Sequence, residues 1–209
     1  MNFPKDIYTE PEPDPDTLAN LGPLRALAGA WIGTAGKDSH PFVDGTEANA
    51  YVEHYQLTPI DAQTNGPQLF YGMHYHSRIT KPGEIEAFHD QTGYWLWEPA
   101  AGNIVFTLAM PRGQVAMAGG TAAADASMFE VASRLGDPHF GIITNPFLDY
   151  GFRTVSFTMT VTVSSDVEWS YHQDTLLEVH GTSSPFHHTD SNTLTRQAAA
   201  TPNPMAQTI

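Results

Sequence analysis

The sequence predicts an all-β protein, folded as a single antiparallel β-barrel of about eight to ten strands with a short helix near its N-terminus. Three observations support this prediction. Short stretches rich in β-branched and aromatic residues recur regularly, separated by turns that contain Gly, Pro or Asn. One stretch alternates strictly between apolar and polar side chains. With 209 residues, of which 41% are hydrophobic, the chain can bury one such core.

The alternation is clearest in residues 154–163. Valine, phenylalanine and methionine occupy one face there, and threonine and serine occupy the other. A strand with this pattern buries one face. After a turn at Ser164–Asp166, the next strand places Trp169, Tyr171 and Leu177 on one parity, and we expect the histidines and acidic residues of the other parity to face solvent.

Two features are predicted before the first strand. Residues 1–20 are an acidic, proline-rich N-terminal extension, in which the prolines of Pro11–Pro15 alternate with acidic residues. This composition favours extended, solvated backbone. A short helix is expected at 23–28, because Pro23 suits the first turn of a helix and Gly29 suits its end.

The first strand is predicted to bend sharply near this helix. Gly29, Gly33 and Gly36 surround Trp31, and glycine within a strand pattern favours a bulge or a close approach. We expect the indole of Trp31 to plug one end of the barrel. The remaining strands are predicted at residues 50–57, 68–79, 86–98, 103–110, 114–123, 128–133, 154–163 and 167–181.

One long connection, 136–153, is too apolar for a plain hairpin loop, and we expect it to fold over a barrel mouth. No internal repeat or second domain is visible, so residues 21–196 are predicted to form one barrel domain. The tail 197–209, in which alanines are followed by prolines, is predicted to be disordered.

Composition excludes several classes of partner. The chain has nine Lys and Arg against 23 Asp and Glu, a formal net charge of −14, so nucleic acid and anionic membrane surfaces are poor partners. It contains no cysteine, which excludes disulfides, thiolate metal sites and cysteine nucleophiles. No run approaches a membrane span, and the N-terminus lacks the pattern of a signal peptide. We therefore expect a cytoplasmic protein.

Histidine is the most informative residue type in so acidic a chain. The sequence has ten, and each alone is more often a hydrogen-bonded surface or core residue than a functional group. His74 and His76 share one face of a predicted strand and could bind a metal together, but no third ligand lies in the same register. The motifs of hydrolases, phosphate loops and dinucleotide sites are absent.

Three separated segments resemble the nitrobindin family. They are the stretch from Pro23 to Gly36, which contains Gly-Ala-Trp-Ile-Gly, the stretch from His89 to Tyr94, and the strand around Trp169–Tyr171 with a histidine-bearing segment after it. The similarity spans residues 21–196. Members are haem-binding β-barrels related in shape to lipocalins and fatty-acid-binding proteins, and one such domain is fused to the THAP DNA-binding module in some animals.

The resemblance implies a barrel that holds ferric b-type haem, with one C-terminal histidine on the iron and the other axial side open. Family members bind nitric oxide and isomerise peroxynitrite. A peroxynitrite isomerase-like activity is therefore expected if haem binds.

Aligned by position, the resemblance implies that the iron ligand is His188 or, one residue earlier, His187. Adjacent side chains in a strand point to opposite sides, so only one of the two can face the interior. His188 is preferred because it lies nearer the family's register, and His89 is placed beside the haem. The other residues predicted for cofactor binding are Trp31, Gly33, Tyr75, Trp95 and Met110.

The residues leave a second function open. A barrel of this size can carry a fatty acid or a similar apolar molecule, so a non-haem intracellular carrier is the alternative. A Soret band in the purified protein, or after addition of hemin, distinguishes the two. The expected partners are a small molecule (haem, nitric oxide, peroxynitrite or an apolar ligand) and, for assembly, a second copy of the chain in a homodimer.

Overall fold

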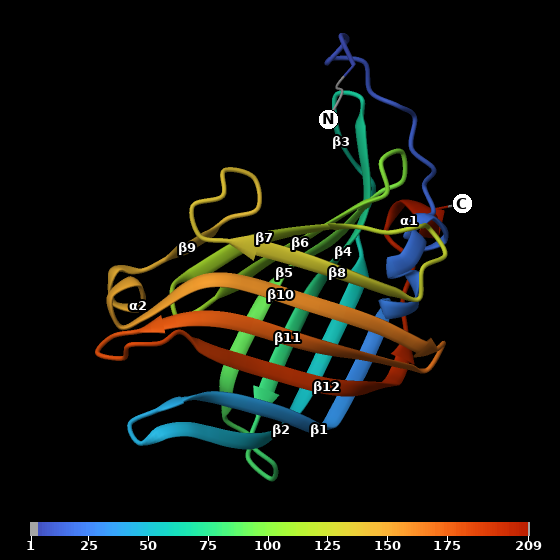
Figure 1. The fold of residues 1–209 in the computed structure, drawn as a ribbon. Coiled ribbons are helices and arrows are strands. Elements are labelled where there is room, and N and C mark those ends of the chain that lie inside the picture. The colour runs from blue at the N-terminus through green and yellow to red at the C-terminus, as the bar shows by residue number, and fades with distance from the viewer. Residues whose placement is uncertain (1–3, 209) are drawn as a thin grey trace.

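The computed structural model describes residues 4–208, and it confirms the all-β prediction (Figure 1). Within these residues, ten long antiparallel strands close into a barrel. They are β1 (Gly29–Phe42), β2 (Gly45–Pro59), β4 (Gln68–Thr80), β5 (Ala87–Glu98), β6 (Asn103–Met110), β7 (Gln114–Thr121), β8 (Met128–Arg134), β10 (Phe152–Ser165), β11 (Glu168–Val179) and β12 (Phe186–Ala199).

Pairing between distant strands closes the barrel. The order around it is β2-β1-β12-β11-β10-β8-β7-β6-β5-β4, and β2 pairs with β4 to complete the ring. Two short strands lie off this path: β3 (Gln63–Asn65) pairs with β4, and β9 (Ile142–Thr144) pairs with β7. A closed ring leaves no long strand with an unpaired edge.

Alternation along β10 and β11 sets the core as the sequence predicts. Phe157, Met159 and Val161 of β10 are buried, and so are Trp169 and Tyr171 of β11. The pattern is interrupted at the start of β10, where the register shifts between residues 154 and 156. This bulge buries the threonine at 154 instead of the expected valine at 155.

The first strand bends where its glycines lie. Pairing of β1 with β12 shifts register between Ile32 and Lys37, as expected for a bulged strand. A Cβ atom on Gly33 would lie 2.3 Å from the Asn192 side chain, and one on Gly36 would lie 2.2 Å from the Tyr51 ring. The strand continues to Phe42, well beyond the predicted glycine-rich stretch.

Two short helical segments lie at one end of the barrel. The α-helix α1 (Thr17–Asn20) is followed by the 3₁₀ helix η1 (Gly22–Leu27), which corresponds to the predicted short helix. Leu21, Leu24 and Leu27 are fully buried. Their spacing of three matches the three residues per turn of a 3₁₀ helix, so all three side chains fall on one face. Within residues 4–208, no helix is long and apolar enough to cross a membrane.

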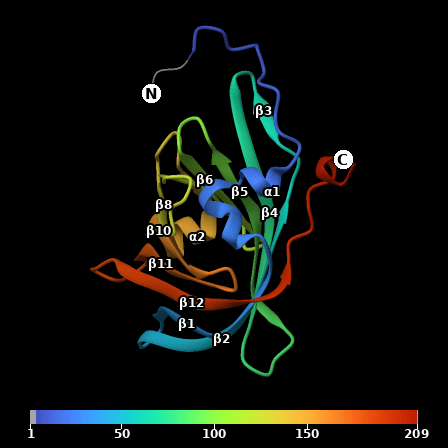
Figure 2. The same ribbon diagram turned by 90° about the vertical axis from the view of Figure 1, so that its right-hand side faces the viewer.

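The segment after Arg196 is tied to the barrel, in contrast to the predicted disorder. β12 continues to Ala199, and a 3₁₀ turn η2 follows at Met205–Thr208. The buried Asn203 donates to Pro15 O (2.9 Å) and Asp61 Oδ1 (2.7 Å) and accepts from the Thr17 amide. The two terminal segments consequently lie on the same side of the molecule (Figure 2).

The long connection 136–153 folds at the other end of the barrel, where the helix α2 (Pro146–Gly151) lies opposite α1 (Figure 1). Asn145 caps α2 by accepting from the amides of Phe147 and Leu148. Ile142, Leu148 and Phe152 line a cavity. The second half of this connection thus lies at the cavity, as predicted.

Candidate functional site

A cavity of about 560 Å³ occupies the α2 end of the barrel. Part of its wall is apolar and is formed by Phe106, Leu108, Met110, Ile142, Phe157 and Met159. Its acidic, basic and histidine lining residues are Asp38, His40, Glu47, Glu53, Lys81, His89, Arg112, His188 and Asp190. A concave apolar site with a few convergent polar groups is the usual form of a small-molecule site.

The tandem histidines of β12 face opposite sides, as strand geometry requires. His188 lines the cavity, and its Nε2 atom lies 2.8 Å from Asp38 Oδ1 and 3.5 Å from Asp190 Oδ2. The side chain of His187 is 66% exposed on the outer surface, and its Nδ1 atom lies 2.8 Å from Asp174 Oδ2. The structure thus places His188, the preferred candidate, on the cavity wall.

Asp38 joins two imidazoles. Its Oδ1 atom bonds to His188, and its Oδ2 atom lies 2.6 Å from Nδ1 of His40. Burial acts to raise the pKa of Asp38, but the hydrogen bonds and charges of His188 and His40 hold the pKa below its usual value. The same contacts with Asp38 and Asp190 raise the pKa of His188 against the effect of burial. Burial raises the pKa of Asp190 to about 7.

His89 lies on the cavity wall in an uncharged form. Burial, and then the nearby Arg112, lower the pKa of His89 to about 4. Arg112 Nη2 donates to His89 Nδ1 (3.0 Å) because a guanidinium only donates. The hydrogen of His89 is therefore on Nε2, which lies 3.3 Å from Gln91 Oε1.

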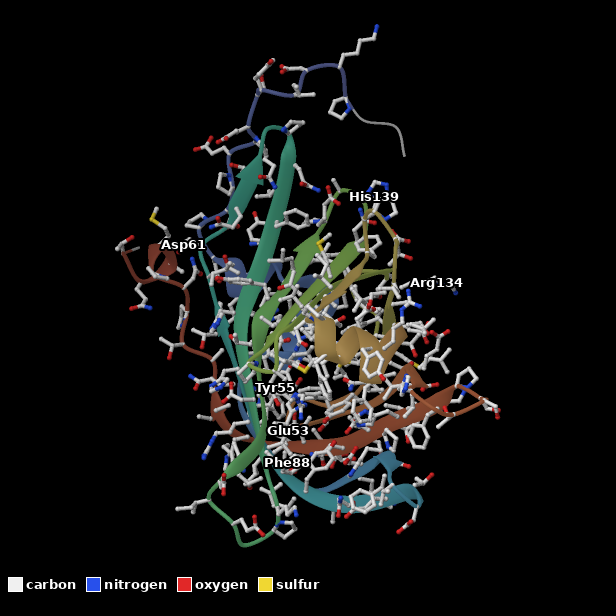
Figure 3. All side chains as sticks on the ribbon, turned by 90° about the vertical axis from the view of Figure 1, so that its left-hand side faces the viewer. Glu53, Tyr55, Asp61, Phe88, Arg134 and His139 are labelled. Atoms are coloured by element: carbon white, nitrogen blue, oxygen red, sulfur yellow. The ribbon has the colours of Figure 1, made fainter. Side chains whose placement is uncertain are left out.

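A buried carboxyl group lies deeper in the barrel, at Glu53. Ser77 Oγ donates to its Oε1 atom (2.7 Å), and the Tyr171 hydroxyl (2.8 Å) and Asn192 Nδ2 (3.1 Å) donate to Oε2. Burial raises the pKa of Glu53 in spite of these bonds. Figure 3 labels Glu53 with Tyr55 and Phe88, which also line the cavity.

Only some of the predicted site residues line the cavity: His188, His89 and Met110 do. Trp31, Gly33, Tyr75 and Trp95 are not part of its lining. The two indoles and Tyr75 are fully buried in the core, where Trp31 Nε1 donates to Leu27 O (2.7 Å) and Trp95 Nε1 donates to the Tyr55 hydroxyl (3.2 Å). These side chains pack against other residues of the barrel core instead of lining the cavity.

Gly93 marks a close approach of backbone. A Cβ atom there would lie 2.0 Å from the Thr107 carbonyl oxygen, so no larger residue fits between β5 and β6. The tyrosine of the same region, Tyr75, donates its hydroxyl hydrogen to that same carbonyl (3.1 Å). The glycine is explained by sheet packing.

His74 and His76 do not form a metal site. His74 bonds to Thr92 Oγ1 (2.8 Å) and His76 to Asp90 (3.1 Å), both on the exposed outer face. Among the described residues, the group whose ligand atoms approach closely enough for a metal ion is Asp38, His188 and Asp190, with all three atoms within 4.8 Å of one another.

The sequence interpretation missed the partners of the histidines. Asp38 and Asp190 are directly opposed across β1 and β12, 152 positions apart in the chain. A register of this kind follows from barrel closure and leaves no local pattern. Arg112 lies in a turn and Glu53 looks like any acidic residue of an alternating strand, so neither carries a recognisable signal.

Comparison with known proteins identifies the family. Residues 20–196 match the family model described as "THAP4-like, heme-binding beta-barrel domain". The crystal structure of Rv2717c from M. tuberculosis is similar in fold, with a TM-score of 0.57 and 22% sequence identity over 87% of this chain and 97% of that chain. No curated protein matches. Because the family model covers most of the chain, this protein belongs to the THAP4-like, haem-binding β-barrel family.

Proposed function

We propose that the barrel binds ferric b-type haem in its cavity, with His188 on the iron, and that the bound haem interacts with nitric oxide and peroxynitrite. One observation carries the proposal: in a haem-binding family, this chain directs a C-terminal histidine to the cavity wall and its neighbour outward.

The residues present suit such a group. One ring nitrogen of His188 bonds to the Asp38 carboxylate, and among residues 4–208 its second ring nitrogen has no hydrogen-bond partner. An axial histidine holds haem iron through Nε2, so in this proposal Nε2 of His188 exchanges the Asp38 carboxylate for the iron. Apolar side chains such as Phe106 suit a porphyrin face, and Lys81 and Arg112 supply cations for its carboxylates.

The chain's own residues have limited roles in this proposal. Bound haem iron supplies an open coordination position for a small ligand. His188 holds the group, and the apolar wall limits water. His89 stays uncharged at neutral pH, because its pKa is about 4, and it adds no positive charge beside the ligand. No protein nucleophile is required, which is compatible with an isomerase-like activity on peroxynitrite.

A non-haem carrier is the second candidate. The apolar wall formed by Leu108, Ile142 and Phe157 supports it, because these side chains also suit an acyl chain. The two candidates differ in what they require of His188. A carrier needs no metal ligand, and its affinity should be insensitive to loss of the imidazole.

Hemin titration of the full chain tests the proposal. Wild type should develop a Soret band at a one-to-one ratio. His188→Ala should lose this band because the iron–protein bond is gone, whereas His187→Ala, which alters the outer face alone, should retain it. His89→Ala should change nitric oxide binding more than haem retention. Circular dichroism checks that each variant is folded.

Two results would contradict the proposal. Wild type that gains no Soret band refutes haem binding, and so do His188→Ala and His187→Ala variants with the same spectrum as wild type. In either case, saturable displacement of a fluorescent fatty acid from the cavity would support the carrier.

A further inference from the structure

We propose that Arg112 is a positioning residue that keeps His89 off the iron: its guanidinium holds the ring hydrogen of His89 on Nε2, the nitrogen with which an axial histidine binds. The inference rests on the proposed haem function and deepens it, because it explains how the second axial position stays open. It starts from one juxtaposition at the cavity wall, the hydrogen bond from Arg112 Nη2 to His89 Nδ1 (3.0 Å).

The cavity is lined by three histidines, His40, His89 and His188. His40 has a carboxylate near each ring nitrogen, Asp38 at 2.6 Å and Glu47 at 3.5 Å. His89 has none, and it lies close enough to His188 that a positive charge there lowers the pKa of His89. His89 is therefore the ring best placed to become a second ligand of iron that His188 already binds.

A second histidine ligand would conflict with the proposed function. Neutral imidazole is a common ligand of haem iron, and His89 is neutral at pH 7 because its pKa is about 4. Iron that holds an imidazole on each axial side has no position left for nitric oxide or peroxynitrite. An open site requires that something prevent His89 from binding.

Arg112 decides where the hydrogen of His89 lies. A guanidinium only donates hydrogen bonds, so Nδ1 of His89 offers its lone pair to Arg112 and the hydrogen of the neutral ring lies on Nε2. A ring nitrogen that carries a hydrogen has no lone pair to give to iron. While Arg112 is in place, His89 cannot bind iron through Nε2.

The hydrogen bonds beyond His89 run in the same direction. The Nε2 hydrogen of His89 faces Gln91 Oε1 (3.3 Å), and Gln91 Nε2 donates to the Tyr75 hydroxyl (2.7 Å). Tyr75 donates in turn to the Thr107 carbonyl (3.1 Å). A hydrogen on Nδ1 of His89 would set two donors against each other at Arg112 and two acceptors at Gln91. Rotation of the Gln91 amide can relieve the second conflict but not the first, so Arg112 is the group that decides.

The turn that carries Arg112 is fixed to the connection beside the cavity. Asn145 Nδ2 donates to Arg112 O (2.6 Å), and the Asn145 amide donates to Gly113 O (2.9 Å). The same Asn145 caps α2. The backbone that carries the guanidinium is therefore positioned by contacts that need no ligand.

His188 differs from His89 at the corresponding ring nitrogen. Among residues 4–208, Nδ1 of His188 has no hydrogen-bond partner. The His188 ring can therefore carry its hydrogen on Nδ1 and give Nε2 to iron. The position of one arginine thus distinguishes two histidines of the same cavity.

The experiment uses the hemin-loaded full chain and measures the spin state of ferric iron by electron paramagnetic resonance. Wild type should be high-spin, because one histidine binds. In Arg112→Met the hydrogen can move to Nδ1, so His89 should bind and most of the iron should become low-spin and six-coordinate. The ratio of iron-bound to unbound His89 should rise at least about tenfold, the usual weight of a hydrogen bond from a charged donor. Cyanide should bind more slowly in stopped flow.

Three further variants show whether this change acts through His89. Arg112→Lys keeps a charged donor and should recover the high-spin form. Lys81→Met removes the other cation of the lining and should stay high-spin, because among the described residues Lys81 has no side-chain hydrogen bond to His89. The double variant Arg112→Met, His89→Leu should return to high spin, since the second ligand is gone.

Two measurements keep the inference testable if Arg112→Met does not retain hemin. Hemin dimethyl ester carries no carboxylates and so does not need the cation of Arg112. High-spin ester in Arg112→Met overturns the inference. Ring-nitrogen NMR of the metal-free wild type reads the tautomer of His89 directly, and a hydrogen on Nδ1 there also overturns it.

The outcomes separate the inference from the proposed function. Arg112→Met protein that binds hemin and stays high-spin overturns the role of Arg112 and leaves haem binding intact. A low-spin form that persists in the double variant does the same, because His89 is then not the added ligand. Wild type that binds no hemin refutes both.

Discussion

The two ends of the barrel are built from the same strands but have opposite chemistry. β1 begins beside η1 with the buried Trp31 and lines the cavity at Asp38 before it ends at Phe42. β12 runs the other way, from His188 at the cavity to Arg196 beside Trp31. One end is therefore closed by packed aromatic and aliphatic side chains, and the other keeps ionisable groups around a hollow. This division separates the residues that stabilise the barrel from those that bind.

Arg196 shows how the closed end differs from the open one. Its guanidinium lies 4.2 Å from the centre of the Trp31 ring and donates to Ala26 O, Ala28 O and Asp166 O (3.0, 2.6 and 2.7 Å). The positive charge of Arg196 therefore interacts with backbone carbonyl groups and with the face of an aromatic ring. The charges at the open end pair with one another, as Asp38 does with His188, and remain near a space that a ligand can enter.

The largest expected effect is at the closed end. Trp31→Ala should lower the free energy of unfolding by about 3–5 kcal/mol, because it leaves a cavity against Trp169 and an unpartnered Leu27 carbonyl. Chemical denaturation measures it. The control is Phe42→Ala at the exposed open end of the same strand, which should change stability by about 0.5 kcal/mol or less. Equal losses of unfolding free energy in the two variants would contradict the difference between the two ends of the barrel.

A smaller loss is expected from the arginine of the closed end. Arg196→Met keeps the apolar stem but removes the hydrogen bonds to three carbonyls and the contact with Trp31, and should cost about 2–3 kcal/mol. Arg153→Met is the matched control. Arg153 forms exposed ion pairs with Asp149 and Glu178, which typically contribute below about 1 kcal/mol. Denaturation midpoints that fall equally would contradict the comparison.

The smallest effect per pH unit concerns Glu53, between the two ends. Burial raises its pKa above the ordinary 4.5, so folding favours the protonated form. The stabilisation that Glu53 contributes to the free energy of unfolding is fully present below the ordinary pKa. It is lost as the pH rises through the folded-state pKa, by at most about 1.4 kcal/mol per pH unit. Relative to Glu53→Gln, wild type should lose stability as the pH rises from acidic to neutral. Parallel stability curves would show that Glu53 does not titrate in this way.

Much of the fold was predictable because its signals are local. The apolar alternation of β10 and β11 reflects the period of a strand, and Pro23 and Gly29 mark the start and end of η1. The ends of β1 and β12 were harder to predict. Residues 38–42 contain Pro41 and polar side chains without clean alternation, and they form a strand because β2 and β12 pair with them.

The candidate site was likewise predictable only in part. Resemblance to a family directed attention to His188 and His89, which line the cavity. The expectation of a mostly apolar cavity added Met110, which also lines it, and Trp95 and Tyr75, which are buried in the core. Aromatic residues in strands have the same appearance whether they pack against each other or against a ligand. Whether such a residue packs in the core or contacts a ligand depends on how deep its side chain lies in the barrel.

The sequence by itself determined that this chain forms one antiparallel barrel and that only one of the two tandem histidines can face inward, because a strand repeats every two residues whatever surrounds it. The tertiary structure decided that the inward residue is His188 and that Asp38 and Asp190 meet it there. Closure of the ring fixes the register between β1 and β12, and that register pairs residues about as far apart in the chain as the barrel allows. No local pattern encodes such a pairing, since it depends on how all ten strands close.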